Sequence, residues 1–257
     1  MPSQGPRVFK SSRAFLIRSA DRGETDLRLT FFTESEGLVP LVAKAALRSR
    51  KRFGGSLQKY FLLQVDWMET PGRASILNSV SLVSSYWEIV AEWDRVRHAD
   101  YLLELAAAIF PQPGPKPKAF RILHAEMRSL ASGEVPSATA RKAEAAFLYL
   151  GGWGPDLGGC RRCGRPLGDL KGGDSRSIRF LLSEGRFFCG SCAASGGLSL
   201  SLGAARTWKA LQATSPSLLG RLRIPIYILE ELQVVIPGYL ELHLGKSFRS
   251  LGGAKNG

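Results

Sequence analysis

Apolar and polar side chains alternate along five short segments in the N-terminal part of the chain. Alternation with a period of two places the apolar side chains on one face of a strand, so each segment is predicted to be a half-buried β-strand. The clearest case is Leu27-Arg28-Leu29-Thr30-Phe31. The predicted strands lie within Phe9–Ser19, Leu27–Phe31, Leu38–Ala45, Tyr60–Trp67 and Ala74–Val83.

These five strands favour a small barrel. The third and fourth strands are expected to turn alternate residues toward its core: Val39, Leu41 and Ala43, then Phe61, Leu63, Val65 and Trp67. No strong helical pattern interrupts the strands between residues 8 and 83, which is typical of a closed or partly open barrel such as an OB-fold. A β-sandwich is the alternative, although it usually needs about seven strands.

From Ser85 onward the apolar spacing becomes helical. Ser85-Tyr86-Trp87-Glu88 has the form of a capping box, and Pro111 is expected to end the helix that follows it. The apolar stripe of this helix is interpreted as core: Tyr86, Ile89, Val90, Trp93, Val96, Leu103, Ala106 and Ile109. Further helices are predicted over Lys118–Ala131, Ser137–Leu150, Ser201–Ala213 and Ile226–Leu244. Pro237-Gly238 is expected to kink or interrupt the last of them.

The order of these patterns predicts an α+β multidomain protein. Residues 1–84 are expected to form the OB-fold β-barrel, and residues 85–158 the first part of a helical domain. Residues 159–197 contain all four cysteines of the chain and are expected to form an inserted metal-binding module. Residues 198–257 are predicted to be a C-terminal helical segment that packs with the helical domain.

The cysteines form two Cys-x-x-Cys pairs, Cys160 with Cys163 and Cys189 with Cys192, on either side of a 25-residue insert. Four thiolates at this spacing suit one structural Zn²⁺ with tetrahedral coordination. Four protein ligands leave no open position, so the zinc is not expected to be catalytic. Two redox dithiols or two disulfides are the alternatives. Neither pair follows a clear predicted strand, and the N-terminus has no hydrophobic signal core, so we expect a zinc site and a cytoplasmic protein.

The formal net charge of +13 narrows the possible partners. Residues 1–60 hold twelve Lys/Arg and five Asp/Glu, a balance of +7, whereas residues 61–110 hold three and seven, a balance of −4. A basic excess in one region points to a polyanion or an acidic membrane surface. No apolar run approaches the ~18 residues of a membrane-spanning helix, and the basic region lacks the apolar face of an interfacial helix. Nucleic acid is therefore the expected partner, with no membrane role.

The strongest candidate for contact with nucleic acid is the segment 44–59, which has six cations and no acidic residue. Lysine and arginine neutralise phosphates, and an aromatic ring can stack on a base. A solvated charged loop is the alternative for this segment taken alone. Neighbouring strands add further cations, which gives the predicted nucleic-acid-binding set Lys10, Arg13, Arg18, Arg28, Lys44, Arg48, Arg50, Lys51, Arg52, Phe53 and Lys59.

No sequence feature indicates catalysis. The chain has no Gly-x-x-x-x-Gly-Lys-Ser/Thr phosphate loop, dinucleotide-binding fingerprint or serine–histidine signature. His98, His124 and His243 are isolated and are interpreted as surface or hydrogen-bonded interior residues. Arg161, Arg162 and Arg165 surround the first cysteine pair, where they either contact phosphates or keep the module soluble. A nucleic-acid-processing enzyme is therefore the weakest of the functional alternatives.

The chain resembles the bacterial RecO family of recombination mediators over about residues 8–251. The resemblance is carried, in order, by Asp21-Arg22-Gly23-Glu24-Thr25-Asp26-Leu27, Thr33-Glu34-Ser35-Glu36-Gly37, Ala43-Lys44, Arg52-Phe53-Gly54-Gly55-Ser56-Leu57-Gln58, Phe147-Leu148-Tyr149-Leu150-Gly151, Cys160-Arg161-Arg162-Cys163-Gly164 and Tyr239-Leu240-Glu241-Leu242-His243-Leu244-Gly245. Two features depart from the family pattern. Ala45 stands where glycine is usual, and Pro237-Gly238 falls in a helix expected to be continuous.

The resemblance implies a non-catalytic protein that binds single- and double-stranded DNA and anneals complementary strands. It also implies action with RecR to load RecA onto strands coated by single-strand-binding protein, and binding of that protein's acidic C-terminal tail. Arg121, Arg128 and Arg141 on the predicted helices are the candidates for holding the tail. A zinc-ribbon RNA-binding or ribosome-associated factor is the alternative with the same charge and metal.

Overall fold

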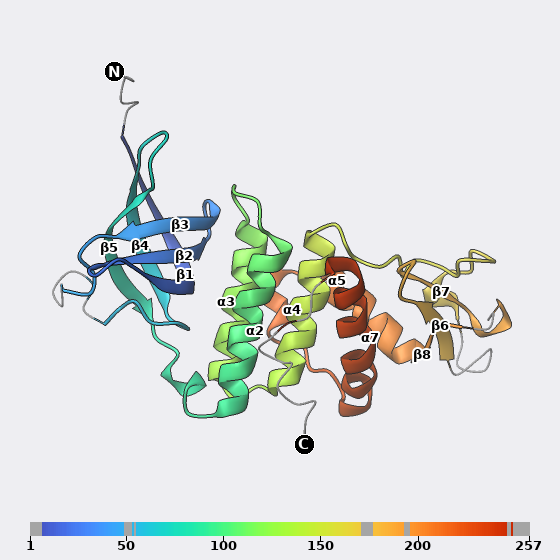
Figure 1. Ribbon diagram of the computed structural model, residues 1–257. Coiled ribbons are helices and arrows are strands. Elements are labelled where there is room, and N and C mark those ends of the chain that lie inside the picture. The colour runs from blue at the N-terminus through green and yellow to red at the C-terminus, as the bar shows by residue number, and fades with distance from the viewer. Residues whose placement is uncertain are drawn as a thin grey trace. The chain divides into compact units, whose positions relative to one another are not determined.

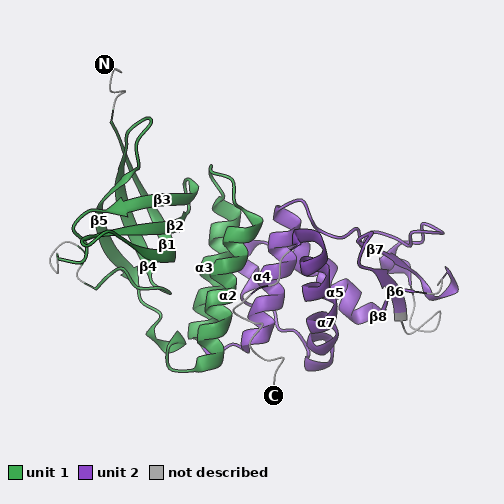
Figure 2. Ribbon diagram, in the orientation of Figure 1, with its two compact units in different colours: residues 1–132 green, residues 133–257 purple. Residues whose placement is uncertain are grey.

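A computed structural model describes residues 7–48, 53, 55–170, 177–192, 196–245 and 248. The chain is a mixed α+β protein, with five strands followed by helices and a small second sheet (Figure 1). Its internal contacts divide it into two compact units, residues 1–132 and 133–257 (Figure 2). The division therefore falls after the second long helix, and two helices share a unit with the N-terminal strands.

The N-terminal sheet closes on itself. Its strands are β1 (Val8–Arg22), β2 (Asp26–Thr33), β3 (Gly37–Ala43), β4 (Leu62–Glu69) and β5 (Ile76–Ser84), in the spatial order β1-β2-β3-β5-β4. Antiparallel ladders join most neighbours, and β4 pairs again with β1. The join between β3 and β5 is parallel and has one residue pair, Val42 with Ile76. All five predicted strands are present.

The interior of this closed sheet holds the predicted core faces. Val39, Leu41 and Ala43 of β3 are buried there, as is the alternating set on and before β4. That second set is Phe61, Leu63, Val65 and Trp67. The period-two pattern therefore identified the core-facing side of both strands correctly.

The first helix begins later than the capping box predicted. Residues Trp87–Ile89 form a short 3-10 turn (η1), and α2 starts only at Trp93 and runs to Ile109. Buried Tyr86, whose hydroxyl lies 2.8 Å from His124 Nε2, and buried Ile89 hold this turn against the unit. Ser85 is therefore not a helix cap, and the predicted stripe is wrong at Val90 and Trp93, which are 50% and 74% exposed.

The other long helix described in the first unit is α3 (Pro117–Ala131). The second unit contains α4 (Pro136–Leu150), α5 (Leu202–Ala213), the short α6 (Pro216–Leu219) and α7 (Ile226–Leu244). Its small sheet has the order β7-β6-β8, formed by β6 (Ser177–Leu181), β7 (Arg186–Phe188) and β8 (Leu198–Ser201). Two more 3-10 turns, η2 (Leu167–Asp169) and η3 (Gly190–Cys192), flank these strands.

Aromatic packing ties the small sheet to the helices of the second unit. The ring centroids of Phe180 on β6 and Trp208 on α5 are 5.1 Å apart, and Tyr239 on α7 lies 5.7 Å from Trp208. All three rings are almost fully buried. None of the helices in the described parts of the chain is long and apolar enough to cross a membrane.

The helix α7 continues through Pro237, so the expected interruption does not occur. Proline removes one helical hydrogen bond, because it has no N–H group, but its fixed φ is close to the helical value. Ile236 is buried before the proline, and Tyr239 and Leu240 are buried after it. Packing on both sides therefore holds the two halves in one helix.

The backbone conformation at Ala45 explains why the family usually has glycine at this position. Its φ is 54°, in the left-handed region that favours glycine, and β3 ends two residues earlier, at Ala43. The Ala45 N–H donates to Asp26 Oδ1 at 2.9 Å, which helps to hold this backbone conformation. A side chain in this region costs about 1–2 kcal/mol relative to the right-handed form.

We expect Ala45→Gly to stabilise the protein by up to ~1 kcal/mol, because the relief of strain exceeds the entropy that glycine adds to the unfolded chain. Thermal and urea unfolding measure this change. The control is Ala46→Gly, since Ala46 is not among the residues with positive φ. That variant should be destabilised by about 1 kcal/mol. Equal destabilisation of both variants would contradict the strain at Ala45.

Candidate nucleic-acid interface and metal centre

Several of the predicted DNA-binding cations are already paired with carboxylates. Lys10 Nζ lies 3.2 Å from Glu36 Oε2 and 3.1 Å from Glu69 Oε2. Arg13 is bound to Glu34 at 2.8 Å, and Lys59 to Asp100 at 2.9 Å. Exposed pairs of this kind add little stability. They do cancel local charge, so these three cations contribute less to attraction of a polyanion than their number suggests.

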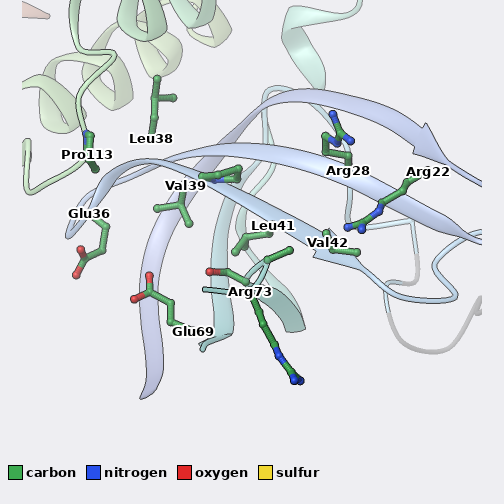
Figure 3. A pocket seen from close by; sticks show the side chains of 13 residues that line it. Arg22, Arg28, Glu36, Leu38, Val39, Leu41, Val42, Glu69, Arg73 and Pro113 are labelled. Atoms are coloured by element: carbon green, nitrogen blue, oxygen red, sulfur yellow. The ribbon is translucent and has the colours of Figure 1, made fainter. Parts of the chain in front are cut away.

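A second group of cations lines a groove where β3 meets β5. The groove has a volume of about 470 Å³ and runs along Leu38–Val42, with Arg22, Arg28 and Arg73 beside it. Figure 3 shows Arg22 and Arg28 at one end of it and the carboxylates of Glu36 and Glu69 at the other. The loop that contains Pro113 forms part of the wall beside Glu36.

The groove continues into a second hollow of about 560 Å³ that shares Arg22, Val42, Arg73 and Ala74 with the first. Arg7 and Lys44 line this part, together with one acidic residue, Asp26. We call the two hollows together the basic groove. Its five cations are Arg7, Arg22, Arg28, Lys44 and Arg73.

The basic groove also contains three carboxylates, fewer than its five cations. Glu36 and Glu69 both bind Lys10. The Asp26 carboxylate accepts the Ala45 N–H, and this hydrogen bond holds the pKa of Asp26 below its usual range. Within the part of the chain that the structure describes, Arg22, Arg28 and Arg73 make no ion pair. The groove therefore presents positive charge at the surface.

The sequence identified Arg28 and Lys44 but missed Arg7, Arg22 and Arg73. These three are distant in sequence, at the start of β1, at its end and in the turn before β5. These arginines lie together because the sheet closes and brings the β1–β2 and β4–β5 turns to the same groove. Two isolated arginines beside turn glycines, Arg22-Gly23 and Gly72-Arg73, were the available signal.

The remaining members of the predicted set fall into three groups. Arg18 and Arg48 are exposed. Arg50, Lys51 and Arg52 lie outside the described residues. Phe53 is 4% exposed and belongs to the core of the closed sheet, so its ring has no open face for a base. The expectation that Phe53 stacks on a base is therefore wrong, because its ring is packed in the interior of the closed sheet.

The four cysteine sulfurs gather at one point of the second unit. Cys160, Cys163, Cys189 and Cys192 place their Sγ atoms within 4.8 Å of one another. The Sγ atoms of Cys163 and Cys189 are 3.8 Å apart. A tetrahedron with metal–sulfur bonds of ~2.3 Å separates its sulfurs by about 3.8 Å, whereas a disulfide bond is ~2.0 Å long. The arrangement fits one metal ion.

The four thiols also need a cation beside them if all of them are to be ionised. Burial opposes ionisation of Cys160, but N–H groups of Cys163, Cys189 and Arg162 donate to its sulfur and lower its pKa to about 6. Burial and the Cys160 sulfur raise the pKa of Cys189, and contacts with the Cys189 and Cys163 sulfurs raise that of Cys192 to about 12. Four adjacent thiolates repel one another, so a divalent ion is needed to hold all four in the charged form.

Backbone turns position the sulfurs. The N–H of Gly164 donates to the Cys160 carbonyl at 2.9 Å, and that of Cys192 to the Cys189 carbonyl at 2.9 Å. A Cβ on Gly159 would lie 2.8 Å from the Gly164 carbonyl oxygen, so glycine is required there. The second pair directly follows β7, contrary to the expectation that neither pair follows a strand. Two independent redox dithiols would not need to lie side by side. The gathering of all four sulfurs is therefore stronger evidence for one metal site than the position of β7 is against it.

Comparison with known sequences identifies the family. The pattern described as "Recombination protein O N terminal" matches residues 9–86, and "Recombination protein O C terminal" matches residues 91–252. The chain belongs to the RecO family. A "DNA repair protein RecO" of Anaeromyxobacter sp. (strain K) is 30% identical over 90% of each chain. Another, from Geobacter metallireducens, is 27% identical over 93% of this chain and 94% of its own.

The arginines predicted to hold a partner's acidic tail do not share one environment. Arg121 and Arg128 are exposed on α3 of the first unit. Arg141, on α4 of the second unit, is 4% exposed and forms an ion pair with Glu144, which is 0% exposed. Lys142 is also buried, and it binds Glu134 at 3.4 Å. Arg141 is therefore a buried ion-pair partner in this RecO-family chain and is unavailable to an acidic tail.

We expect Arg141→Ala to destabilise the protein by about 3 kcal/mol, because it leaves the Glu144 carboxylate buried without its cation. Urea unfolding monitored by circular dichroism measures the change. The control Arg128→Ala removes an exposed arginine and should change stability by less than about 0.5 kcal/mol. Equal, small effects of both substitutions would contradict the structural role of Arg141.

Proposed function

We propose that the chain is a non-catalytic DNA-binding protein that acts as a recombination mediator in DNA repair. The observation that carries this proposal is the basic groove, in which five cations from separate parts of the N-terminal sheet line one surface. Membership in the RecO family and the names of its relatives as DNA repair proteins support the same conclusion.

We assign the N-terminal closed sheet to the OB type. In OB-folds, oligonucleotides bind on the face of strands 2 and 3, between the loops that join strands 1–2 and 4–5. The basic groove has this position, because Arg28 of β2 and residues of β3 form it between the β1–β2 and β4–β5 turns. The position of Arg22 and Arg73 beside these turns supports a path for the sugar–phosphate backbone.

Contact through phosphates accounts for the proposed activity without any chemical step. Arginines that neutralise the backbone reduce the repulsion between two strands, and bases then pair by themselves. This mechanism favours annealing of complementary strands with little dependence on sequence. We further propose, from the family, that the protein acts with RecR to load RecA onto strands coated by single-strand-binding protein. The exposed Arg121 and Arg128 are left as candidates for the acidic tail of that protein.

The groove predicts a measurable salt dependence. Replacing Arg22 and Arg73 together with alanine should weaken binding of single-stranded DNA of any sequence, and should reduce the slope of log affinity against log salt by about 1.4. Fluorescence anisotropy over a salt series measures both quantities. The control replaces Lys209 and Arg221, two exposed cations of the second unit, and removes the same net charge. Its slope should equal that of the unsubstituted protein.

Annealing of strands coated with single-strand-binding protein tests the mediator role with the same proteins. The unsubstituted protein and the Lys209/Arg221 control should accelerate annealing, and the Arg22/Arg73 variant should lose most of this effect. No acceleration by the unsubstituted protein would refute the mediator proposal. Preference for structured RNA over single-stranded DNA in direct competition would favour the RNA-binding alternative.

We propose that the four cysteines hold one structural Zn²⁺ and that residues 159–197 fold as a module around it. Softness of the four thiolates and their near-tetrahedral spacing support zinc over harder cations. All four ligands come from the protein, so the ion would fix the two turns relative to each other and supply no open position for chemistry.

Freshly purified protein is therefore expected to contain about one zinc per chain, measured by inductively coupled plasma mass spectrometry. Cys189→Ala should lose the metal and the hydrogen-exchange protection of β6 and β7, because metal binding in such modules supplies folding free energy. DNA binding by the N-terminal unit should persist in the soluble fraction. Metal-free protein with full protection, or a stable disulfide, would contradict the zinc site.

A further inference from the structure

A second cavity of the first unit has no lining residue in common with the basic groove. It lies between the middle of β1, the start of β4 and the 3-10 turn η1, and has a volume of about 330 Å³. Its apolar walls include Leu16, Leu57 and Phe61, and its polar lining includes Ser19 and Gln58. We call it the Trp87 cavity, after the largest side chain that lines it.

Trp87 is exposed and yet held in place. Its ring is packed edge-on against Phe61, with centroids 4.9 Å apart and planes at 80°, but the residue is 57% exposed. Val90, also a lining residue, is 50% exposed. An exposed apolar patch beside a cavity marks a binding site more often than a scattered surface residue does. The ring is therefore available to a ligand, and packing against Phe61 limits its movement.

The backbone at the edge of the cavity is strained and anchored. Tyr60 has a φ of 68°, in the region that non-glycine residues rarely adopt. Its hydroxyl donates to Asp100 Oδ1 at 3.0 Å, and Lys59 Nζ donates to the same oxygen at 2.9 Å. Strain of this kind persists where surrounding contacts hold it, and it is common at ligand sites. Asp100 on α2 thus fixes the conformation of the cavity's edge.

The position of the cavity in the chain indicates its ligand. Leu57, Gln58 and Lys59 are lining residues, and they end the segment 44–59, which has six cations and no acidic residue. Lys59 lines the cavity and the exposed Arg18 precedes the lining residue Ser19, so a strand whose phosphates contact these cations would have its bases beside the cavity. Aromatic rings bind bases of any type by stacking, and amide and hydroxyl groups can pair with base edges.

We propose that the Trp87 cavity takes up one unstacked base of single-stranded DNA, which stacks on Trp87 while Gln58 and Ser19 lie within reach of its polar edge. The proposal rests on the proposed DNA-binding function and adds a base-contacting site to it. The cavity, with a volume of about 330 Å³, has room for one flat base beside the Trp87 ring.

The test compares two strands of equal length and charge, oligothymidylate and the same backbone with abasic sites in place of thymine. The unsubstituted protein should bind oligothymidylate about tenfold more tightly than the abasic strand, and Trp87→Ala should bind both equally. Its salt slope should not change, since no phosphate contact is lost. Trp87→Phe should restore most of the discrimination, because it keeps an aromatic ring.

Trp93→Ala is the matched control. Trp93 is 74% exposed and six residues from Trp87, but it is not among the lining residues. This variant should discriminate between the strands as the unsubstituted protein does. Thermal unfolding confirms that each variant is folded. A strand containing 5-iododeoxyuridine should photocross-link to Trp87, as located by mass spectrometry of the peptides.

Three results would overturn the proposal. If the Trp87→Ala variant still bound oligothymidylate more tightly than the abasic strand, Trp87 would not be the residue that contacts the base. Equal loss of affinity for both strands would mean that Trp87 acts only through the fold. The Trp87→Ala variant could instead lose self-association, measured by sedimentation, and still prefer oligothymidylate over the abasic strand. The exposed patch of Trp87 and Val90 would then be a contact between two copies of the chain. If the unsubstituted protein bound neither strand, the proposed function itself would fail.

Discussion

The parallel contact between β3 and β5 is the constraint on which the N-terminal unit depends. Val42 pairs with Ile76 there, and the Val42 N–H donates to the Ser75 carbonyl at 2.9 Å. The other joins of the closed sheet are longer antiparallel ladders. Val42 is the next-to-last residue of β3 and Ile76 is the first residue of β5, so the earlier residues of β3 have no partner in β5, and the basic groove runs along them.

In the function that we propose, the basic groove and the Trp87 cavity divide the two tasks that nucleic-acid binding requires. Arginines hold phosphates without regard to sequence, and an open aromatic ring holds a base without strong preference among bases. Both features come from one unit and neither needs a catalytic group. This combination suits a protein that must hold strands long enough to pair and then release them.

The small sheet of the second unit is held in place in a different way. Its small sheet has short strands, and the cysteine turns lie at one end of them. Phe180, Trp208 and Tyr239 bury the other part of the sheet against α5 and α7. A metal on the four sulfurs would hold the turns that this aromatic packing does not reach, which explains how so small a sheet is stable within a helical unit.

Local periodicity and spacing determined much of this protein. Alternation in Tyr60–Trp67 identified its buried face, because a strand turns alternate side chains to opposite sides whatever it packs against. The Cys-x-x-Cys spacing identified the four cysteines whose sulfurs gather, since each short turn brings two sulfurs together. The positive φ of Ala45 agrees with the glycine expected from the family. The alternation along a strand and the short turn within each cysteine pair depend on neighbouring residues alone.

Only the tertiary structure decided which side chains are exposed and which charges remain unpaired. Val90 and Trp93 belong to the predicted helical stripe but are exposed, at the end of the 3-10 turn and at the start of α2, because Tyr86 and Ile89 take the buried positions. Arg141 has the sequence pattern of a surface arginine, yet its partner Glu144 is buried with it. Arg7, Arg22 and Arg73 come together because the sheet closes. Long-range packing sets burial and charge pairing, and no local pattern in the sequence encodes it.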